Sequence, residues 1–149
     1  MSTSLEFLAD DFDEILRLAP DAIIVHDMKS CVHYWNAAAE EMYGWTSEEI
    51  KGYPIDKICY LDAKEREFAM AKIRDYGTWE GELRQIDRKG DEHLVRCRQR
   101  LIRNQSGDPL GVISFNTDIT ESRKLEDAEK RAHHIRSSSL LAGGIAHDL

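Results

Sequence analysis

The chain has 149 residues, 42% of them hydrophobic, which is enough for one ordinary hydrophobic core and little more. Its formal net charge of −8 makes the average surface repel phosphate backbones and anionic lipids, so nucleic acid is not expected as a partner. No segment approaches the roughly 18 apolar residues that a membrane-spanning helix needs, and no secretory signal is expected. Cys31, Cys59 and Cys97 fit neither a disulfide framework nor a CxxC metal site, so we expect reduced thiols, no bound metal and a cytoplasmic location.

Residues 1–20 are expected to form an amphipathic helix that ends at Pro20. Its apolar residues recur at steps of three and four, and acidic residues face away from them. These apolar residues are Leu5, Leu8, Phe12, Ile15 and Ala19. The stripe could pack on the helix's own domain or form the seam of a dimer, because the spacing suits both.

Residues 21–121 combine short strand and helix signals in an α+β order. β-branched and aromatic residues predict strands at 22–25, 31–35, 79–86, 93–103 and 110–117. Capping residues predict helices that begin after Asn36, Thr46 and Asp62, and the last two form the capping boxes Thr46-x-x-Glu49 and Asp62-x-x-Glu65. Two strands, a run of short helices and three further strands predict a five-stranded antiparallel sheet with the helices on one face.

The strand at 93–103 shows the clearest alternation of inward and outward residues. Val95, Cys97, Gln99 and Leu101 share one face, and Arg96, Arg98 and Arg100 share the other. An arginine row could bind phosphate, but it is also typical of the solvated face of an antiparallel sheet, which we prefer because the chain is acidic.

Four stretches of this region resemble a PAS sensor domain, and the resemblance covers about residues 15–121. They are Asp21–Ile24, Asn36–Trp45, Trp79–Glu82 and Asn116–Thr120. The resemblance implies a PAS fold that binds a small molecule between sheet and helices, or that serves mainly as a dimerising relay. The implied pocket lining would be Ile24, His26, Gln85, Val95, Cys97, Gln99, Ser114 and Asn116. This mixed lining suits a small polar-aromatic ligand, but the same residues would also serve as the core of a domain without a ligand.

Two familiar PAS cofactors are not expected. Light-oxygen-voltage PAS domains form a flavin-cysteinyl adduct through a Gly-Arg-Asn-Cys motif, and the matching stretch here, Gly52-Tyr53-Pro54-Ile55, has no cysteine. Haem-binding PAS domains take a histidine from the long helix, and residues 62–76 contain none. The ligand, if there is one, stays unknown at this point.

Residues 122–149 are expected to form a helix that pairs in a parallel coiled coil, and thus a homodimer. Its seam residues step by three and four, and they are Leu125, Ala128, Ala132, Ile135, Ser139, Ala142, Ala146 and Leu149. Small seam residues bury little area, and Gly143 and Gly144 each cost roughly 1 kcal/mol relative to alanine in a helix interior. The predicted contact is therefore weak and easily repacked.

The stretch from Gly143 to Asp148 resembles the phosphoacceptor box of sensor histidine kinases. By this resemblance, His147 attacks the γ-phosphate of ATP, and Asp148 orients the imidazole or accepts its proton. We expect an N-terminal fragment of a longer kinase that is inactive alone, because the ATP-binding domain would lie further along the parent chain. A response regulator or receiver domain would be the partner of that parent.

The relay to His147 is expected to run through Asp118, Ile119 and Thr120, where the last strand becomes the helix. Short hydrogen-bonding side chains at such a junction can fix its geometry. Two alternatives stay open: a ligand-free PAS module for dimerisation or partner docking, and a PAS-containing enzyme or transcription factor of another kind.

Overall fold

The computed structural model describes the backbone of residues 19–148 and the side chains of residues 19–139. The chain divides into two compact units between Asp118 and Ile119. The helix predicted for residues 1–20 lies, apart from its last two residues, outside the described part of the chain.

The described residues of the first unit form five strands and four short helices. The strands are β1 (Ala22–Asp27), β2 (Val32–Trp35), β3 (Thr78–Ile86), β4 (Glu92–Arg103) and β5 (Pro109–Asp118). The helices are α2 (Ala37–Tyr43), α3 (Ser47–Ile50), the 3-10 helix η1 (Ile55–Lys57) and α4 (Ala63–Tyr76). The strands and helices predicted for residues 21–121 therefore all form, with bounds shifted by one or two residues.

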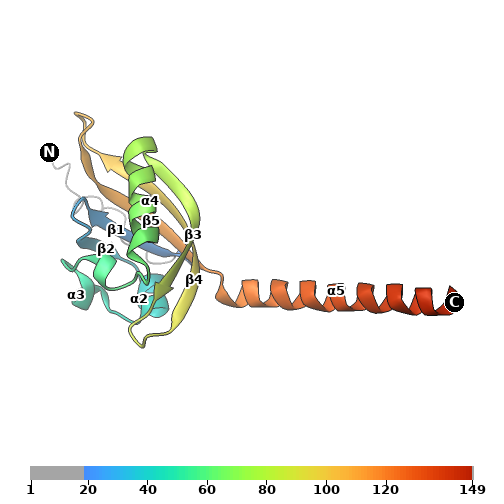
Figure 1. Ribbon diagram of the computed structural model, residues 1–149. Coiled ribbons are helices and arrows are strands. Elements are labelled where there is room, and N and C mark those ends of the chain that lie inside the picture. The colour runs from blue at the N-terminus through green and yellow to red at the C-terminus, as the bar shows by residue number, and fades with distance from the viewer. Residues whose placement is uncertain (1–18, 149) are drawn as a thin grey trace. The chain divides into compact units, whose positions relative to one another are not determined.

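The strands form one antiparallel sheet in the order β2-β1-β5-β4-β3. Helices α2, α3 and α4 lie on one face of it (Figure 1). The prediction of a five-stranded antiparallel sheet with helices on one face is confirmed. The last strand in sequence, β5, lies in the centre, so its end is held by β1 on one side and β4 on the other.

Capping side chains begin α2 and α3 as predicted. Asn36 accepts a hydrogen bond from the Ala39 backbone N–H at 3.0 Å. Thr46 and Glu49 form a complete capping box, in which each side chain accepts from the backbone N–H of the other residue. These bonds satisfy donors that the first helical turn leaves without partners.

The capping box predicted for α4 forms only in part. Asp62 accepts from the Lys64 backbone N–H at 2.8 Å, as an N-cap should. Glu65, however, accepts from the backbone and side chain of Arg84 on β3, because a charged guanidinium on the neighbouring strand competes for the carboxylate. The expected reciprocal bond is thereby replaced by a link between α4 and the sheet.

Most of the core lies between the helices and the sheet, and Ile23, Val25 and Tyr34 form a further buried cluster on the opposite face. Ile24, Trp35 and Tyr43 belong to the cluster between β1, β2 and α2, while Ala69 packs with Leu83 and Val95 below α4. Each fully buried aliphatic or aromatic side chain of this kind stabilises the fold by about 1.5–3 kcal/mol. Ile50 of α3 and Ile55 of η1 belong to the first cluster as well, so the core joins all four helices to one face of the sheet.

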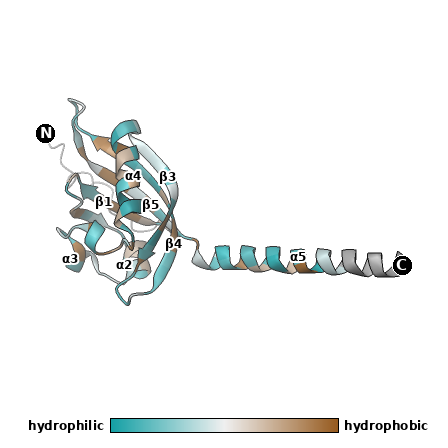
Figure 2. Cartoon of the chain, in the orientation of Figure 1, coloured by the Kyte–Doolittle hydropathy of each residue, from teal (hydrophilic) through white to brown (hydrophobic). Residues whose placement is uncertain are grey.

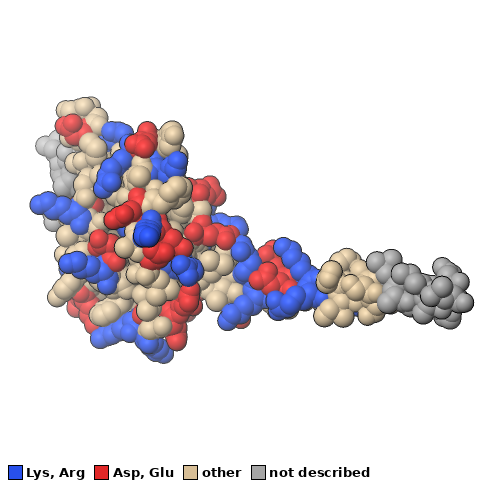
Figure 3. All heavy atoms as spheres, viewed as in Figure 1, with Lys and Arg blue, Asp and Glu red and all other residues tan. Residues whose placement is uncertain are grey.

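The second unit is the helix α5 (Thr120–Asp148). Hydrophilic residues dominate its first half (Figure 2), and charges of both signs are gathered on its first part (Figure 3). Two apolar side chains nevertheless face solvent, with 65% of Leu125 and 63% of Ile135 exposed. Within the described residues, no helix is both long enough and apolar enough to cross a bilayer.

Candidate functional site

Polar side chains form a hydrogen-bonded chain inside the first unit. Gln99 donates to Ser114 Oγ at 3.1 Å, and Ser114 donates to Asn116 Oδ1 at 2.7 Å. Asn116 then donates to the Tyr43 hydroxyl oxygen at 2.9 Å, and Tyr43 donates to Gln85 Oε1. All the donors point in the same sense, so each bond polarises the next in this buried, low-dielectric setting.

The network contains four of the residues predicted to line a pocket, and the others are buried around it. Ile24 packs in the cluster below α2, and Val95 and Cys97 pack in the cluster below α4. His26 is buried near the end of β1. The structure therefore brings the predicted residues to one face of the sheet, under the helices, from four different strands.

Tyr43 is the network residue that sequence reasoning missed. It lies 42 residues from Gln85 and 73 from Asn116, so spacing along the chain gives no sign of either bond. Burial raises the pKa of its hydroxyl, which therefore stays a donor at neutral pH. The only available signal was helical spacing, because Ala39 and Tyr43 occupy the buried side of α2.

His26 is a neutral imidazole in this interior. Its Nδ1–H donates to the Asp27 carbonyl at 2.9 Å, which leaves the Nε2 lone pair free, and Nε2 has no partner among the described atoms. Burial is the largest cause that lowers the pKa of His26 to about 4, and the positive charge of Arg66 adds to it. The ring therefore accepts hydrogen bonds at neutral pH.

Arg66 on α4 is a buried arginine that sequence reasoning also missed. Only 4% of its surface is exposed, and its guanidinium stacks on the Tyr60 ring at 5.0 Å from the centroid. One nitrogen, Nη2, donates to Ser30 Oγ at 3.1 Å, while Nε and Nη1 have no partner. Its spacing with Ala69, Met70 and Ile73 was the missed signal, because it places Arg66 on the buried stripe of the helix.

The predicted relay residues lie at the boundary between the two units. Asp118 ends β5, Ile119 follows, and Thr120 begins α5. Asp118 accepts from His93 Nδ1 at 2.7 Å, and the other ring nitrogen bonds to Asp87 at 2.8 Å. Burial opposes protonation of His93, but the bonds to these two carboxylates outweigh it and raise the pKa of the ring. The end of β5 is thus tied to the turn between β3 and β4.

A family model described as "PAS domain" matches residues 20–121. The chain belongs to the PAS family. Among curated proteins, this PAS chain is 27% identical over 109 residues to the "Probable diguanylate cyclase DgcE" of Escherichia coli. The match covers 70% of this chain but spans only 10% of that relative's length.

Solved structures similar to this PAS domain come from several proteins. The PAS domain of a protein from Colwellia psychrerythraea matches with a TM-score of 0.69 and 21% identity, covering 76% of this chain and 98% of that one. A sensory box histidine kinase/response regulator from Burkholderia thailandensis matches with a TM-score of 0.60 and 18% identity, and the match covers 85% of this chain and 98% of that one. A PAS domain from a two-component sensor histidine kinase matches with a TM-score of 0.62 and 15% identity, and the match covers 76% of this chain and 97% of that one. At such identities these matches establish the fold.

Two cysteines of the PAS domain are buried thiols. Burial raises the pKa of Cys59 to about 12 and that of Cys97 to about 12, so both stay protonated at neutral pH. Cys59 is the cysteine nearest in sequence to Gly52–Ile55, and it packs in the apolar cluster below α2. These side chains therefore act as small hydrophobic residues.

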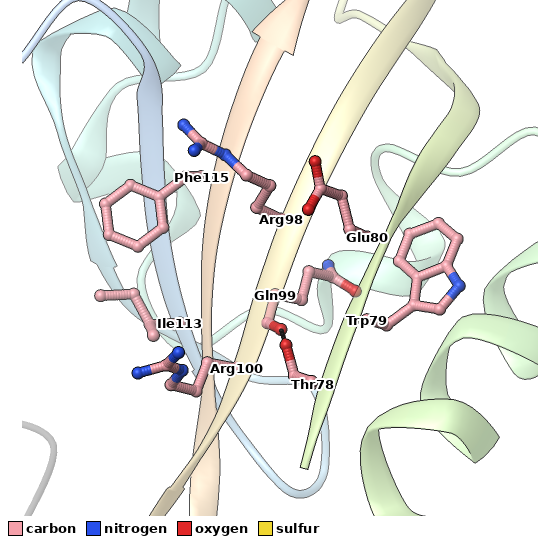
Figure 4. Close-up of a pocket in the computed structure, with 8 residues that line it drawn as sticks. All are labelled: Thr78, Trp79, Glu80, Arg98, Gln99, Arg100, Ile113 and Phe115. Carbon is pink, nitrogen blue, oxygen red and sulfur yellow. Dashed lines mark hydrogen bonds between the residues drawn. The ribbon is translucent and has the colours of Figure 1, made fainter. Parts of the chain in front are cut away.

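The opposite face of the PAS sheet carries a groove of about 480 Å³, shown in Figure 4. Arg98 and Arg100 project there beside Phe115 and Ile113. Arg96 and Arg98 lie within 3.7 Å and 3.9 Å of the carboxylates of Glu82 and Asp21. The arginine row therefore lies on the outer face of the sheet, as the alternation predicts, and its side chains are exposed and partly paired with carboxylates.

The predicted phosphoacceptor residues follow the PAS domain in the second unit. The backbone of His147 and Asp148 is part of α5. Their side chains lie outside the described residues, so their chemistry stays a prediction from the resemblance. No group of His, Cys, Asp and Glu in the described part of the chain is arranged to hold a metal ion.

Proposed function

We propose that this chain is the signal-sensing module of a two-component sensor histidine kinase. In this proposal, residues 21–121 are the PAS sensor, and residues 122–149 are a coiled-coil linker and the start of the phosphoacceptor helix. The observation that carries the proposal is the single helix α5, which follows β5 directly and includes the stretch Gly143–Asp148 that resembles a phosphoacceptor box. Two similar solved PAS structures that are described as parts of histidine kinases support it.

The sensing site in this proposal is the interior between the sheet and helices α2 and α4. A small molecule there would exchange hydrogen bonds with the side-chain network that runs from Gln99 to Gln85. Because β5 contributes Ser114 and Asn116 to that network, a change in these bonds acts on the strand that leads into α5. The proposed ligand would bind more tightly to one arrangement of the strand than to the other.

The proposed relay is the junction of Asp118, Ile119 and Thr120. A tenfold change between two populations needs only about 1.4 kcal/mol of differential binding free energy. Asp118 is held by His93, so movement of the end of β5 relative to β4 would break or re-form this bond. In this proposal, the junction has one state with this bond made and one with it broken.

The proposed output is a homodimer that pairs along α5. Leu125 and Ile135 are on the predicted seam, and both are mostly exposed in the single chain. Pairing with a second copy would remove that apolar surface from water. The small residues elsewhere on the seam keep the predicted contact weak enough to repack.

The proposed chemistry occurs at His147 and uses ATP bound by the catalytic domain of the parent protein. A ring nitrogen of His147 forms a bond to the γ-phosphorus, the bond from that phosphorus to the β–γ bridging oxygen breaks, and ADP leaves. Asp148 selects the reactive tautomer or takes up the imidazole proton. A response regulator or receiver domain then takes the phosphoryl group, and the protein works in the cytoplasm.

Phosphorylation in trans tests this function. The chain is mixed with the ATP-binding domain of its parent and radiolabelled ATP, and acid-labile label on the chain is measured. We expect label on wild type and on His134→Gln, an exposed histidine control, and none on His147→Gln. Label that survives His147→Gln would remove His147 from the mechanism.

A diguanylate cyclase context is the second candidate, favoured by the curated relative that matches the PAS region. In that case the signal would still leave the sensor through α5, but no phosphohistidine would form. A catalytic domain of that kind further along the parent chain would establish this alternative.

A ligand-free interaction module is the third candidate. The buried hydrogen-bonded network favours it in part, because the side chains of Gln99, Ser114, Asn116, Tyr43 and Gln85 bond to one another. Native mass spectrometry of purified protein separates the candidates: a bound small molecule supports a sensor, and its absence together with no thermal shift across a metabolite panel supports the module.

A further inference from the structure

The guanidinium of Arg66 is a buried charge without a countercharge. Within the described part of the chain, no carboxylate lies within ion-pair distance of it. Nε and Nη1 together carry three N–H donors, and neither nitrogen has a hydrogen-bond partner. A buried charge in this state is strongly destabilising, and buried polar groups in folded proteins are normally satisfied. The position therefore requires an explanation beyond packing.

The surroundings of Arg66 add further polar atoms that have no partner. His26 on β1 lies close enough for the charge of Arg66 to lower its pKa, and His26 Nε2 is unsatisfied. Tyr60, on which the guanidinium stacks, pairs with the backbone of Gln85, whose side-chain Nε2 is also unsatisfied. The donors on Arg66 and Gln85 are suited to a negatively charged or strongly accepting group.

A purely structural role, in which Arg66 only links α4 to Ser30, does not explain why its charge is buried with two unpartnered nitrogens. Its one hydrogen bond, to Ser30 Oγ at 3.1 Å, uses a single nitrogen and would be available to a neutral side chain. Stacking on Tyr60 stabilises the guanidinium by less than the penalty of burying the charge. A negative charge beside the guanidinium would remove this penalty.

We propose that Arg66 is the anion-binding residue of the sensing site, and that the molecule sensed there is a small organic anion bearing a carboxylate or phosphate group. The anionic group accepts from Nε and Nη1 of Arg66, and Gln85 Nε2 donates to the same molecule. His26 Nε2 accepts from a hydroxyl or amino group of the ligand. This inference rests on the proposal that the interior is a sensing site, and it adds the charge of the ligand.

Thermal unfolding of the full chain with three small probes tests the proposal. The probes are acetate, its uncharged isostere acetamide, and inorganic phosphate, at a constant ionic strength set with sodium chloride. We expect acetate or phosphate at tens of millimolar to raise Tm by about 2–6 °C and acetamide to leave it unchanged. A shift with acetate alone supports a carboxylate ligand, and a shift with phosphate alone supports a phosphorylated one.

Matched variants assign the effect to the buried charge. Arg66→Gln should abolish the shift, and Arg74→Gln, on the exposed side of the same helix, should keep it. Arg66→Met is the second variant, because replacing an unpaired buried charge by an apolar side chain is often neutral or stabilising. A folded Arg66→Met protein that has lost the anion response supports the proposal.

A direct readout is the Arg66 Nε–H resonance in a proton–nitrogen NMR spectrum, assigned by its loss in Arg66→Gln. It should move when acetate or phosphate is added and not when acetamide is added. The proposal is overturned if wild type shows neither a Tm shift nor a resonance shift with either anion, or if Arg66→Gln responds as wild type does. Neither result would alter phosphorylation of His147, so this proposal and the proposed kinase function can fail separately.

Discussion

The stability of the PAS domain should depend on pH through His26. Burial is the main cause that lowers its folded pKa from the ordinary 6.5 to about 4, while the hydrogen bond and charge of Asp27 and the charge of Asp56 oppose the shift. The unfolded chain takes up a proton near pH 6.5, but the folded protein does not until about pH 4. The stability that depends on neutral His26 is complete above pH 6.5 and falls between these values, by about 1.4 kcal/mol per pH unit.

Urea unfolding of wild type and His26→Gln from pH 7 to pH 4 measures this contribution. The wild-type unfolding free energy should fall more steeply with decreasing pH than that of His26→Gln. His134→Gln, whose side chain is exposed, serves as the control and should follow wild type. Parallel curves for wild type and His26→Gln would show that His26 titrates normally.

Spacing predicts which side chains are buried better than it predicts what they bind. Alternation along β4 gives Val95, Cys97 and Gln99 as inward residues, and all three are buried. Arg66 was missed because a charged side chain on a helix is read as exposed, although its position on the stripe indicates burial. Partners such as Tyr43 and Gln85 meet only through the fold, so their contact has no local sequence signal.

Asn36 joins the first strand to the first described helix. Besides capping α2, its Oδ1 accepts from the Ile23 backbone N–H at 2.9 Å, and its Nδ2 donates to the Asp21 carbonyl at 3.0 Å. Asn36→Ala should lower the unfolding free energy by about 2–4 kcal/mol, because it removes a cap and leaves buried backbone groups unsatisfied.

Chemical denaturation of Asn36→Ala against Thr46→Ala checks this difference. Thr46 caps α3 at an exposed site, so its loss should cost only about 1 kcal/mol. Equal losses of unfolding free energy for the two variants would mean that the hydrogen bonds of Asn36 to Ile23 and Asp21 add no stability beyond its cap of α2.

Gly81 on β3 is required by the approach of the Trp79 ring. A Cβ at position 81 would lie 2.4 Å from Trp79 Cζ2, closer than any real contact. Gly81→Ala should therefore displace the indole and lower the unfolding free energy by about 1–3 kcal/mol. The loss of stability should be accompanied by a change in tryptophan fluorescence.

The matched test for Gly81 is Gly81→Ala in a Trp79→Ala background. Removing the ring removes the clash, so the added methyl should then cost much less. An equal cost with and without Trp79 would place the strain in the backbone of β3 instead.

Local sequence signals set the ends of the elements, and side chains on neighbouring elements modify them. Asn36 and Thr46 cap the helices for which they were predicted, because both bonds stay within one helical turn. Glu65 does not complete the predicted capping box because its carboxylate pairs with Arg84 on β3. The two side chains come together only when the sheet has formed. The strand order, with β5 central, likewise depends on pairings that no single stretch specifies.

The self-association of the whole chain should depend on the exposed apolar residues of α5. Leu125→Asp with Ile135→Asp places two charges on the predicted seam and should convert a dimer to monomer at micromolar concentration. Sedimentation equilibrium measures the change. Lys130→Asp with Ser137→Asp, on the side of α5 away from the predicted seam, is the matched control and should leave the dimer intact.

A dimer that survives the seam substitutions would mean that α5 is not the main contact. The first helix predicted for residues 1–20 or the outer face of the sheet would then be the region to test. A monomer in wild type as well would contradict the proposed output of the module.

The central claim is that the PAS domain controls phosphorylation of His147 through the junction at Asp118 and Thr120. The most direct test is the rate of ATP-dependent phosphorylation at His147 in the full-length parent, for wild type, Asp118→Ala with Thr120→Ala, and the exposed control Ser122→Ala. We predict that the double variant changes the rate on the order of tenfold and that Ser122→Ala does not. Equal rates for wild type and the double variant, in protein that is still folded and dimeric, would contradict the claim.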